Sequence, residues 1–196
     1  MSALTSAAGM AAAVLGFIAF IPYVISILKG KSAPNRATWW IWTFLGVIIS
    51  ASYFSVGATD SALVTISFVV GPFITALLSL KYGEGGWNRF DASCVAGALL
   101  GALLWWLFSA PVIALVLTIF IDGMGLLPTV KKAYFRPQSE DSLAWALFFV
   151  SALLNLFAIE QWSFEVAVYP VYIFLLESTV LLLLLRPKLE KRLFIL

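Results

Sequence analysis

The chain of 196 residues has no histidine and only one cysteine, Cys94. Without histidine, this chain can form neither a Ser-His-Asp triad nor a histidine-ligated metal site. A single cysteine excludes an internal disulfide and offers no metal-site pattern. A glycine-rich phosphate loop is also absent. We therefore expect no enzymatic activity, no cofactor and no metal.

Charge is also scarce, at 11% of residues, whereas hydrophobic residues make up 62% and the mean hydropathy is +1.02. Soluble domains carry about 25% charged residues, and no basic tail or basic helix indicates nucleic-acid binding. A helix of roughly 17–25 apolar residues crosses the hydrocarbon core of a bilayer. Seven segments fit that length, near 5–28, 37–57, 61–80, 92–109, 111–130, 142–159 and 165–185. The sequence thus predicts an all-α integral membrane protein with seven transmembrane helices in a lipid bilayer.

The few cations are distributed unevenly. All twelve Lys and Arg residues follow the first, third, fifth or seventh segment, whereas the loops on the opposite side carry only Asp60, Glu160 and Glu165. Loops rich in Lys and Arg stay in the cytoplasm. We therefore expect an outside N-terminus and a cytoplasmic C-terminus in a cell (inner) membrane.

An internal repeat accompanies this pattern. When the sequence is shifted by 106 residues, Pro22 falls on Pro128 and Trp39 falls on Trp145. Each copy has three segments, and one further segment lies between the copies, so the predicted parts are a first three-helix bundle at 1–82, a linker helix at 83–110 and a second bundle at 111–196. An odd number of spans per copy would invert the second copy, and the linker helix restores its direction. The sequence thus predicts a parallel repeat.

This plan of three, one and three helices resembles the SWEET and PQ-loop transporter superfamily over nearly the whole chain. Members carry proline in the helices of each bundle, where it permits bending, and the similar positions here are Pro22, Pro72, Pro128 and Pro170. The Pro-Gln dipeptide is absent at the equivalent places, which read Pro22-Tyr23 and Pro128-Thr129. The asparagine that sugar-carrying SWEETs place in each third helix is also absent. The resemblance implies alternating access without implying sugar as the solute.

The prolines favour moving helices on physical grounds as well. A proline inside a membrane helix removes one backbone hydrogen bond and produces a kink. Matched kinks in two repeats, such as those at Pro22 and Pro128, suggest gates around a shared site. The alternative is that proline is simply commoner in membrane helices than in soluble ones.

Two carboxyls, Asp122 and Glu177, lie about midway along the fifth and seventh segments. An acid at that depth costs roughly 2.5 kcal/mol or more, so it should face the protein interior. Because no cation lies at that depth, burial favours the neutral form of the acid. Such a group titrates during transport, binds a cationic solute, or serves only as a protonated structural clip. The repeat places Gly16 and Gly71 at the equivalent positions, so the two copies differ at the predicted site.

Three further polar or aromatic residues are candidates for the solute path. Trp39 and Trp145 either anchor the headgroup boundary or stack on a ring-shaped solute. Asn155 either binds solute or bridges helices. The third segment carries Ser61, Thr65, Pro72, Thr75 and Ser79 on one helical face, and the linker carries the small-residue ridge Ser93, Gly97 and Gly101. The face lines a path or bonds across helices, and the ridge lets another helix approach closely.

Taken together, these patterns favour a membrane transporter of a small polar solute, with or without proton coupling and with homo-oligomers possible. The alternative is a receptor or assembly protein of the same architecture that does not transport.

Overall fold

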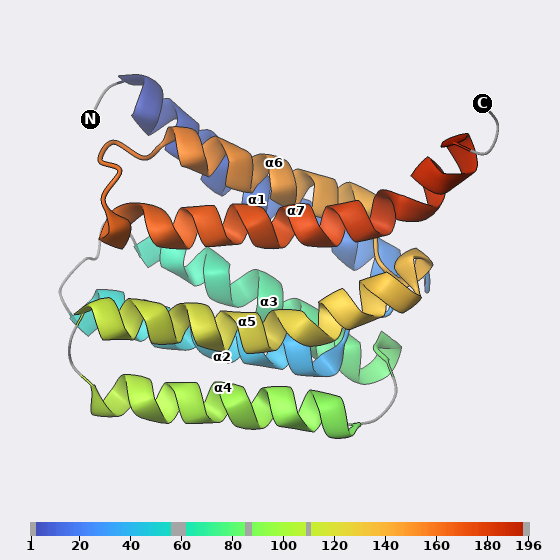
Figure 1. Cartoon of the computed structure of the whole chain (residues 1–196), viewed down its shortest axis with the longest axis horizontal. Coiled ribbons are helices and arrows are strands. Elements are labelled where there is room, and N and C mark those ends of the chain that lie inside the picture. The colour runs from blue at the N-terminus through green and yellow to red at the C-terminus, as the bar shows by residue number, and fades with distance from the viewer. Residues whose placement is uncertain (1–2, 56–61, 85–87, 109–110, 194–196) are drawn as a thin grey trace. The chain divides into compact units, whose positions relative to one another are not determined.

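The computed structural model describes residues 3–55, 62–84, 88–108 and 111–193, which consist of helices and short connections (Figure 1). The described residues form α1 Ala3–Leu28, α2 Arg36–Ser55, α3 Ala62–Tyr82, α4 Arg89–Leu107, α5 Pro111–Phe135, the 3₁₀ helix η2 Pro137–Ser139, α6 Ser142–Phe157 and α7 Phe164–Leu193. The prediction of an all-helical chain with seven long helices is therefore confirmed. Asp60, which the sequence places in a loop opposite the basic side, lies outside the described residues.

Four of the described helices are long and apolar enough to cross a membrane, and they cover Ala3–Leu28, Arg89–Leu107, Val112–Phe135 and Phe164–Pro187. Two further stretches, Val69–Tyr82 and Ser142–Phe157, are apolar but shorter. These lengths agree with an integral membrane protein. The side of the membrane that each end faces stays a prediction.

The helices group into two compact units. The first unit comprises residues 1–32 and 130–196, which include α1, α6, α7 and the end of α5. The second unit comprises residues 33–129, which include α2, α3, α4 and most of α5. The chain passes from the second unit to the first inside α5, one residue after Pro128. The predicted division into a first bundle at 1–82, a linker helix at 83–110 and a second bundle at 111–196 stays a prediction.

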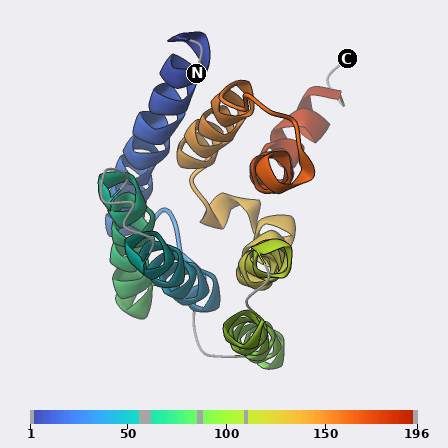
Figure 2. The same ribbon diagram turned by 90° about the vertical axis from the view of Figure 1, so that its left-hand side faces the viewer.

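In the first unit, α6 lies between α1 and α7 (Figures 1 and 2). The Ser151 hydroxyl on α6 donates to the Ala12 carbonyl on α1 at 2.8 Å. Further along the same contact, the rings of Phe20 and Phe148 meet edge to face with 5.0 Å between centroids. One polar and one aromatic contact therefore fix α1 against α6 at different heights.

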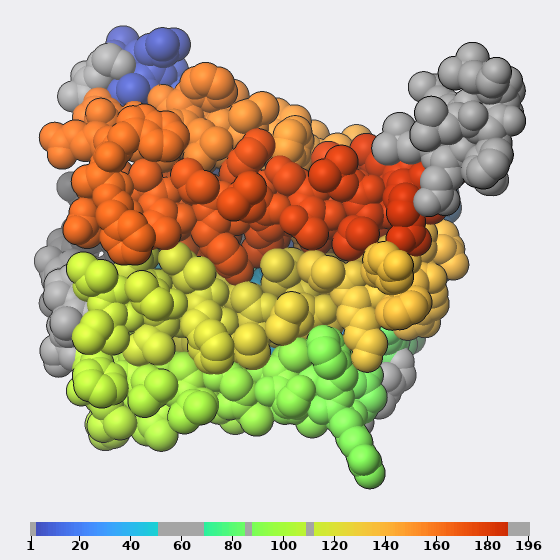
Figure 3. Space-filling model, in the orientation of Figure 1, coloured from blue at the N-terminus to red at the C-terminus, as the bar shows by residue number. Residues whose placement is uncertain are grey.

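In the second unit, α2 packs against α3, α4 and α5 around a core of Ile41, Leu45, Ala98 and Ile121. The glycines of α4 allow this helix to pack close to α5. A Cβ atom at Gly97 would lie 2.8 Å from the Met124 sulfur, and one at Gly101 would lie 2.8 Å from Ile121 Cγ1. Figure 3 shows α4 filling the surface alongside α5 on this face. Two members of the predicted small-residue ridge thus meet a neighbouring helix, whereas the third, Ser93, is exposed.

Candidate functional site

The four candidate hinge prolines all lie inside helices: Pro22 in α1, Pro72 in α3, Pro128 in α5 and Pro170 in α7. Pro128 is fully buried and Pro72 is buried, whereas the other two are half-buried. Each proline lacks the N–H that would complete the helical ladder, so each marks a point where its helix bends more easily.

Asp122 is only 6% exposed and belongs to the second unit, on the face of α5 that meets α2. Its backbone carbonyl accepts a hydrogen bond from the Trp42 indole at 3.2 Å. Gly125, nearly one turn further along α5, makes room for that ring, because a Cβ there would lie 2.9 Å from indole atoms. An apolar helix long enough to span a membrane thus carries a buried carboxyl, on a residue whose backbone carbonyl bonds the Trp42 indole.

Glu177 lies half-buried on α7 in the first unit. The two carboxyls singled out by sequence therefore belong to different units, and each is placed by the packing of its own unit. The sequence predicted the depth of both along their helices, but which helices surround them follows from packing that the sequence pattern does not reveal.

The tryptophans Trp39 and Trp145 are both buried, at 2% and 1% exposed. Each lies four residues after the residue that caps its helix, Asn35 for α2 and Asp141 for α6. The Asn35 side-chain oxygen accepts from the Thr38 amide at 3.2 Å, and the Asp141 carboxylate accepts from the Ala144 amide at 2.8 Å. Both rings are therefore enclosed by protein.

Both tryptophans also meet an aromatic ring three residues further along. Trp39 and Trp42 lie edge to face at 5.1 Å between centroids, and Trp145 and Phe148 do so at 5.9 Å. The caps and these ring pairs coincide under the same shift of 106 residues that aligns the prolines. Local geometry at the start of α2 is therefore repeated at the start of α6.

Asn155 is exposed on α6. On α3, Pro72, Thr75 and Ser79 are buried on one face. The Thr75 and Ser79 hydroxyls donate within their own helix, to the Gly71 carbonyl at 3.0 Å and the Ala76 carbonyl at 2.6 Å. Ser61 and the side chain of Thr65, which complete the predicted stripe, lie outside the described part of the chain.

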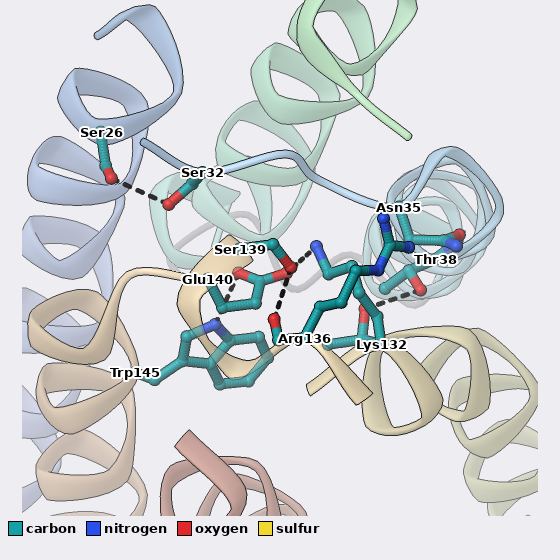
Figure 4. A network of polar contacts seen from close by, with 10 residues as sticks. Ser26, Ser32, Asn35, Thr38, Lys132, Arg136, Ser139, Glu140 and Trp145 are labelled. Atoms are coloured by element: carbon teal, nitrogen blue, oxygen red, sulfur yellow. Dashed lines mark hydrogen bonds and ion pairs between the residues drawn. The ribbon is translucent and has the colours of Figure 1, made fainter. Parts of the chain in front are cut away.

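Sequence reasoning missed a buried polar cluster at the turn between α5 and α6 (Figure 4). The Lys132 ammonium forms an ion pair with Glu140 Oε1, and both side chains are at most 1% exposed. The other oxygen, Glu140 Oε2, accepts from the Trp145 indole at 3.0 Å. The signal in the sequence that could have indicated this cluster is the opposite-charge pair Lys132 and Glu140, which lies on either side of Pro137 and shortly before Trp145.

The equivalent turn after α1 is held differently. There the Ser26 and Ser32 hydroxyls bond to each other at 2.8 Å, and Ser26 occupies the place of Lys132 under the repeat shift. Pro34 occupies the place of Glu140. The first turn is thus closed by neutral hydroxyls and the second by buried charges.

Within the described residues, no group of three His, Cys, Asp or Glu side chains comes together to hold a metal ion. Comparison with known proteins finds no matching family model, no matching characterised protein and no matching solved structure. The likeness to the SWEET and PQ-loop superfamily therefore stays a prediction that rests on sequence architecture.

Proposed function

We propose that the chain is a membrane transporter that moves a small polar solute by alternating access, with Asp122 as the group that takes up a proton or a cationic solute. The observation that carries this proposal is the burial of that carboxyl, 6% exposed, in an apolar helix long enough to span a membrane. Intramembrane acids are costly and mark ion or substrate pathways by default.

The packing of the two units supports a duplicated architecture of the SWEET and PQ-loop type. Under the repeat shift, α1 corresponds to α5, α2 to α6 and α3 to α7. The first unit joins α1 to α6 and α7, and the second joins α5 to α2 and α3, with α4 added. Each unit therefore combines the first helix of one copy with the second and third helices of the other. The same combination occurs in both units, which supports a duplicated architecture.

Pro128 is the proline best placed to act as a hinge. The chain passes between units one residue beyond it while α5 stays helical. A helix bends most easily at a proline, because the proline removes one hydrogen bond of the helical ladder. Pro22, its repeat partner, has the same role in α1 in this proposal, and Pro72 and Pro170 let the third helices follow.

The proposed orientation places the basic turns in the cytoplasm and the N-terminus outside. Thiol labelling in a Cys94→Ser background tests it, with new cysteines at the exposed positions Gln138 and Gln161. An impermeant reagent added outside should modify Gln161→Cys and spare Gln138→Cys. The reverse pattern would overturn the orientation.

Uptake into proteoliposomes under an imposed proton gradient tests the function, with labelled sugars, amino acids and nucleosides as probes. Asp122→Asn should abolish concentrative uptake of the accepted class while exchange or binding partly persists. Glu177→Gln should weaken binding, whereas Glu165→Gln, an exposed carboxyl at the start of the same helix, should change neither. Full concentrative uptake by Asp122→Asn would reduce that residue to a structural clip. A folded wild-type protein that takes up none of the three classes would favour a receptor or assembly role.

A further inference from the structure

We propose that Glu140 is a positioning residue for Trp145, anchored by Lys132, so that Trp145 forms a fixed aromatic wall of the solute path. The role of Trp145 in a solute path rests on the proposed function, whereas its positioning by Glu140 rests on the geometry of the α5–α6 turn. It assigns roles to two charged residues that lie outside the pattern of carboxyls and prolines described above.

The three side chains form a chain of contacts inside the first unit (Figure 4). One Glu140 oxygen pairs with the Lys132 ammonium, and the other accepts the Trp145 indole N–H at 3.0 Å. A carboxylate used at both oxygens has its plane and direction fixed. The indole N–H is donor only, so this bond sets the orientation of the ring about its side-chain torsions.

Burial makes the arrangement rigid. The Lys132 and Glu140 side chains are 1% and 0% exposed, and Trp145 is 1% exposed. Little water reaches groups this buried, so no solvent partner competes for either bond. Separating the pair within the protein would leave two uncompensated charges in a poorly solvated place. The contacts among Lys132, Glu140 and Trp145 therefore connect the last turn of α5 with the first turn of α6, a few residues after Pro128.

The repeat provides a natural contrast. Trp39 occupies the place of Trp145, but Pro34 stands where Glu140 would be, and a proline side chain supplies no acceptor. Trp39 meets Trp42 edge to face at 5.1 Å, as Trp145 meets Phe148 at 5.9 Å. The residue that accepts from the Trp145 indole is therefore not repeated at the matching position of the first copy.

Indole N–H cross-peaks in a ¹H–¹⁵N spectrum of the full chain in nanodiscs measure this positioning directly. The chain has eight tryptophans, and Trp145→Phe and Trp39→Phe assign the two peaks that matter. Glu140→Gln should move the Trp145 peak upfield, because an amide oxygen is a weaker acceptor than a carboxylate. The Trp39 peak should stay. Lys131→Met, at an exposed cation beside the buried one, should leave the Trp145 peak unmoved.

Glu140→Gln leaves Lys132 buried without its charge partner, so it can fail to fold. The double variant Lys132→Met/Glu140→Leu removes both charges together and keeps an apolar filling, which is tolerated far better than removal of one partner. In it the Trp145 peak should shift to the position of an indole without an acceptor. A Trp145 peak at the wild-type position in either folded variant would overturn the positioning role.

Uptake kinetics separate the two parts of the proposal. For whichever of the sugar, amino acid or nucleoside probes the wild type accepts, the double variant should raise KM about tenfold and leave kcat within about twofold, because a loosened ring weakens binding. An unchanged KM with a moved indole peak would overturn the solute-path role and keep the positioning. Failure of the Asp122 test in the same vesicles would instead count against transport itself.

Discussion

The two turns that follow α1 and α5 occupy the same place in the repeat, yet they are closed by different chemistry. After α1, Gly30 adopts a positive φ of 66° and the Lys31 amide bonds the Ser26 carbonyl at 2.9 Å, a glycine-terminated helix end. After α5, the short helix η2 and the buried pair of Lys132 and Glu140 close the turn. The first turn depends on backbone freedom and neutral hydroxyls, the second on electrostatics. Two turns at matching places in the sequence repeat are thus closed by different contacts, and only the turn after α5 contains the buried ion pair of Lys132 and Glu140.

The largest expected effect comes from breaking the charged turn on one side only. Lys132→Met leaves the Glu140 carboxylate buried without its partner, which should cost about 3–5 kcal/mol of unfolding free energy. Ser26→Ala, at the equivalent place, removes one neutral hydrogen bond and should cost about 1 kcal/mol. Equilibrium unfolding in mixed micelles measures both. Equal losses in the two variants would contradict the claim that the turns differ in kind.

The next effect concerns the helix that only the second unit possesses. Gly101→Val should lower the unfolding free energy by about 1–3 kcal/mol through overpacking. A Cβ added there would lie 2.8 Å from Ile121 and 3.0 Å from Phe120. Ser93→Val, two turns earlier on an exposed face, should change the midpoint of thermal unfolding little. A Gly101→Val variant with the same unfolding free energy as the wild type would contradict the close packing of α4 against α5.

The N-terminal caps of α2 and α6 test how similar the two copies are. Asn35→Ala and Asp141→Ala each remove a side-chain acceptor from a helix N-terminus, and each should cost about 1 kcal/mol. Hydrogen exchange of the first-turn amides of α2 and α6 should rise to a similar extent in the two variants. An effect confined to one helix would mean that only one cap contributes to stability.

The smallest expected effect tests the glycine-terminated end of α1. Gly30→Ala should cost about 0.5–1 kcal/mol, because an L side chain resists a positive φ although no atom lies within 4 Å of the added Cβ. Gly30→Asn should cost less, since asparagine tolerates this region. Thermal unfolding of the two variants side by side ranks them. A larger loss for asparagine than for alanine would exclude a backbone origin.

Much of the fold was accessible from the sequence because hydrophobic length and proline position are local signals. Seven helices were predicted, and the four prolines lie inside helices as expected. Which helix packs on which was not accessible. Nearly every face of these helices is apolar, so α1 carries no pattern that distinguishes α6 from α2 as its neighbour.

The candidate site was predictable only in part. Trp39 and Trp145 followed from the repeat, and Asp122 from its depth along an apolar helix. In the sequence Lys132 is one of twelve cations on the predicted basic side, because the positive-inside rule uses the charge of loops and not the burial of side chains. Glu140 lies in a short turn where an acid is ordinarily solvated, and only tertiary packing makes it a partner of Trp145.

The discontinuous make-up of the first unit bears on how the protein is assembled during synthesis. The second unit comes from one uninterrupted stretch, 33–129, which includes α2, α3, α4 and most of α5, so it can associate as soon as Thr129 has left the ribosome. Helix α1 is made before any of them, but its partner α6 begins only at Ser142. Helix α1 is therefore complete before the helix that it packs against has been made. Its small-residue surface at Gly9 and Gly16, which meets Ala158 and Ser151 in the finished unit, lacks this α6 partner throughout that interval.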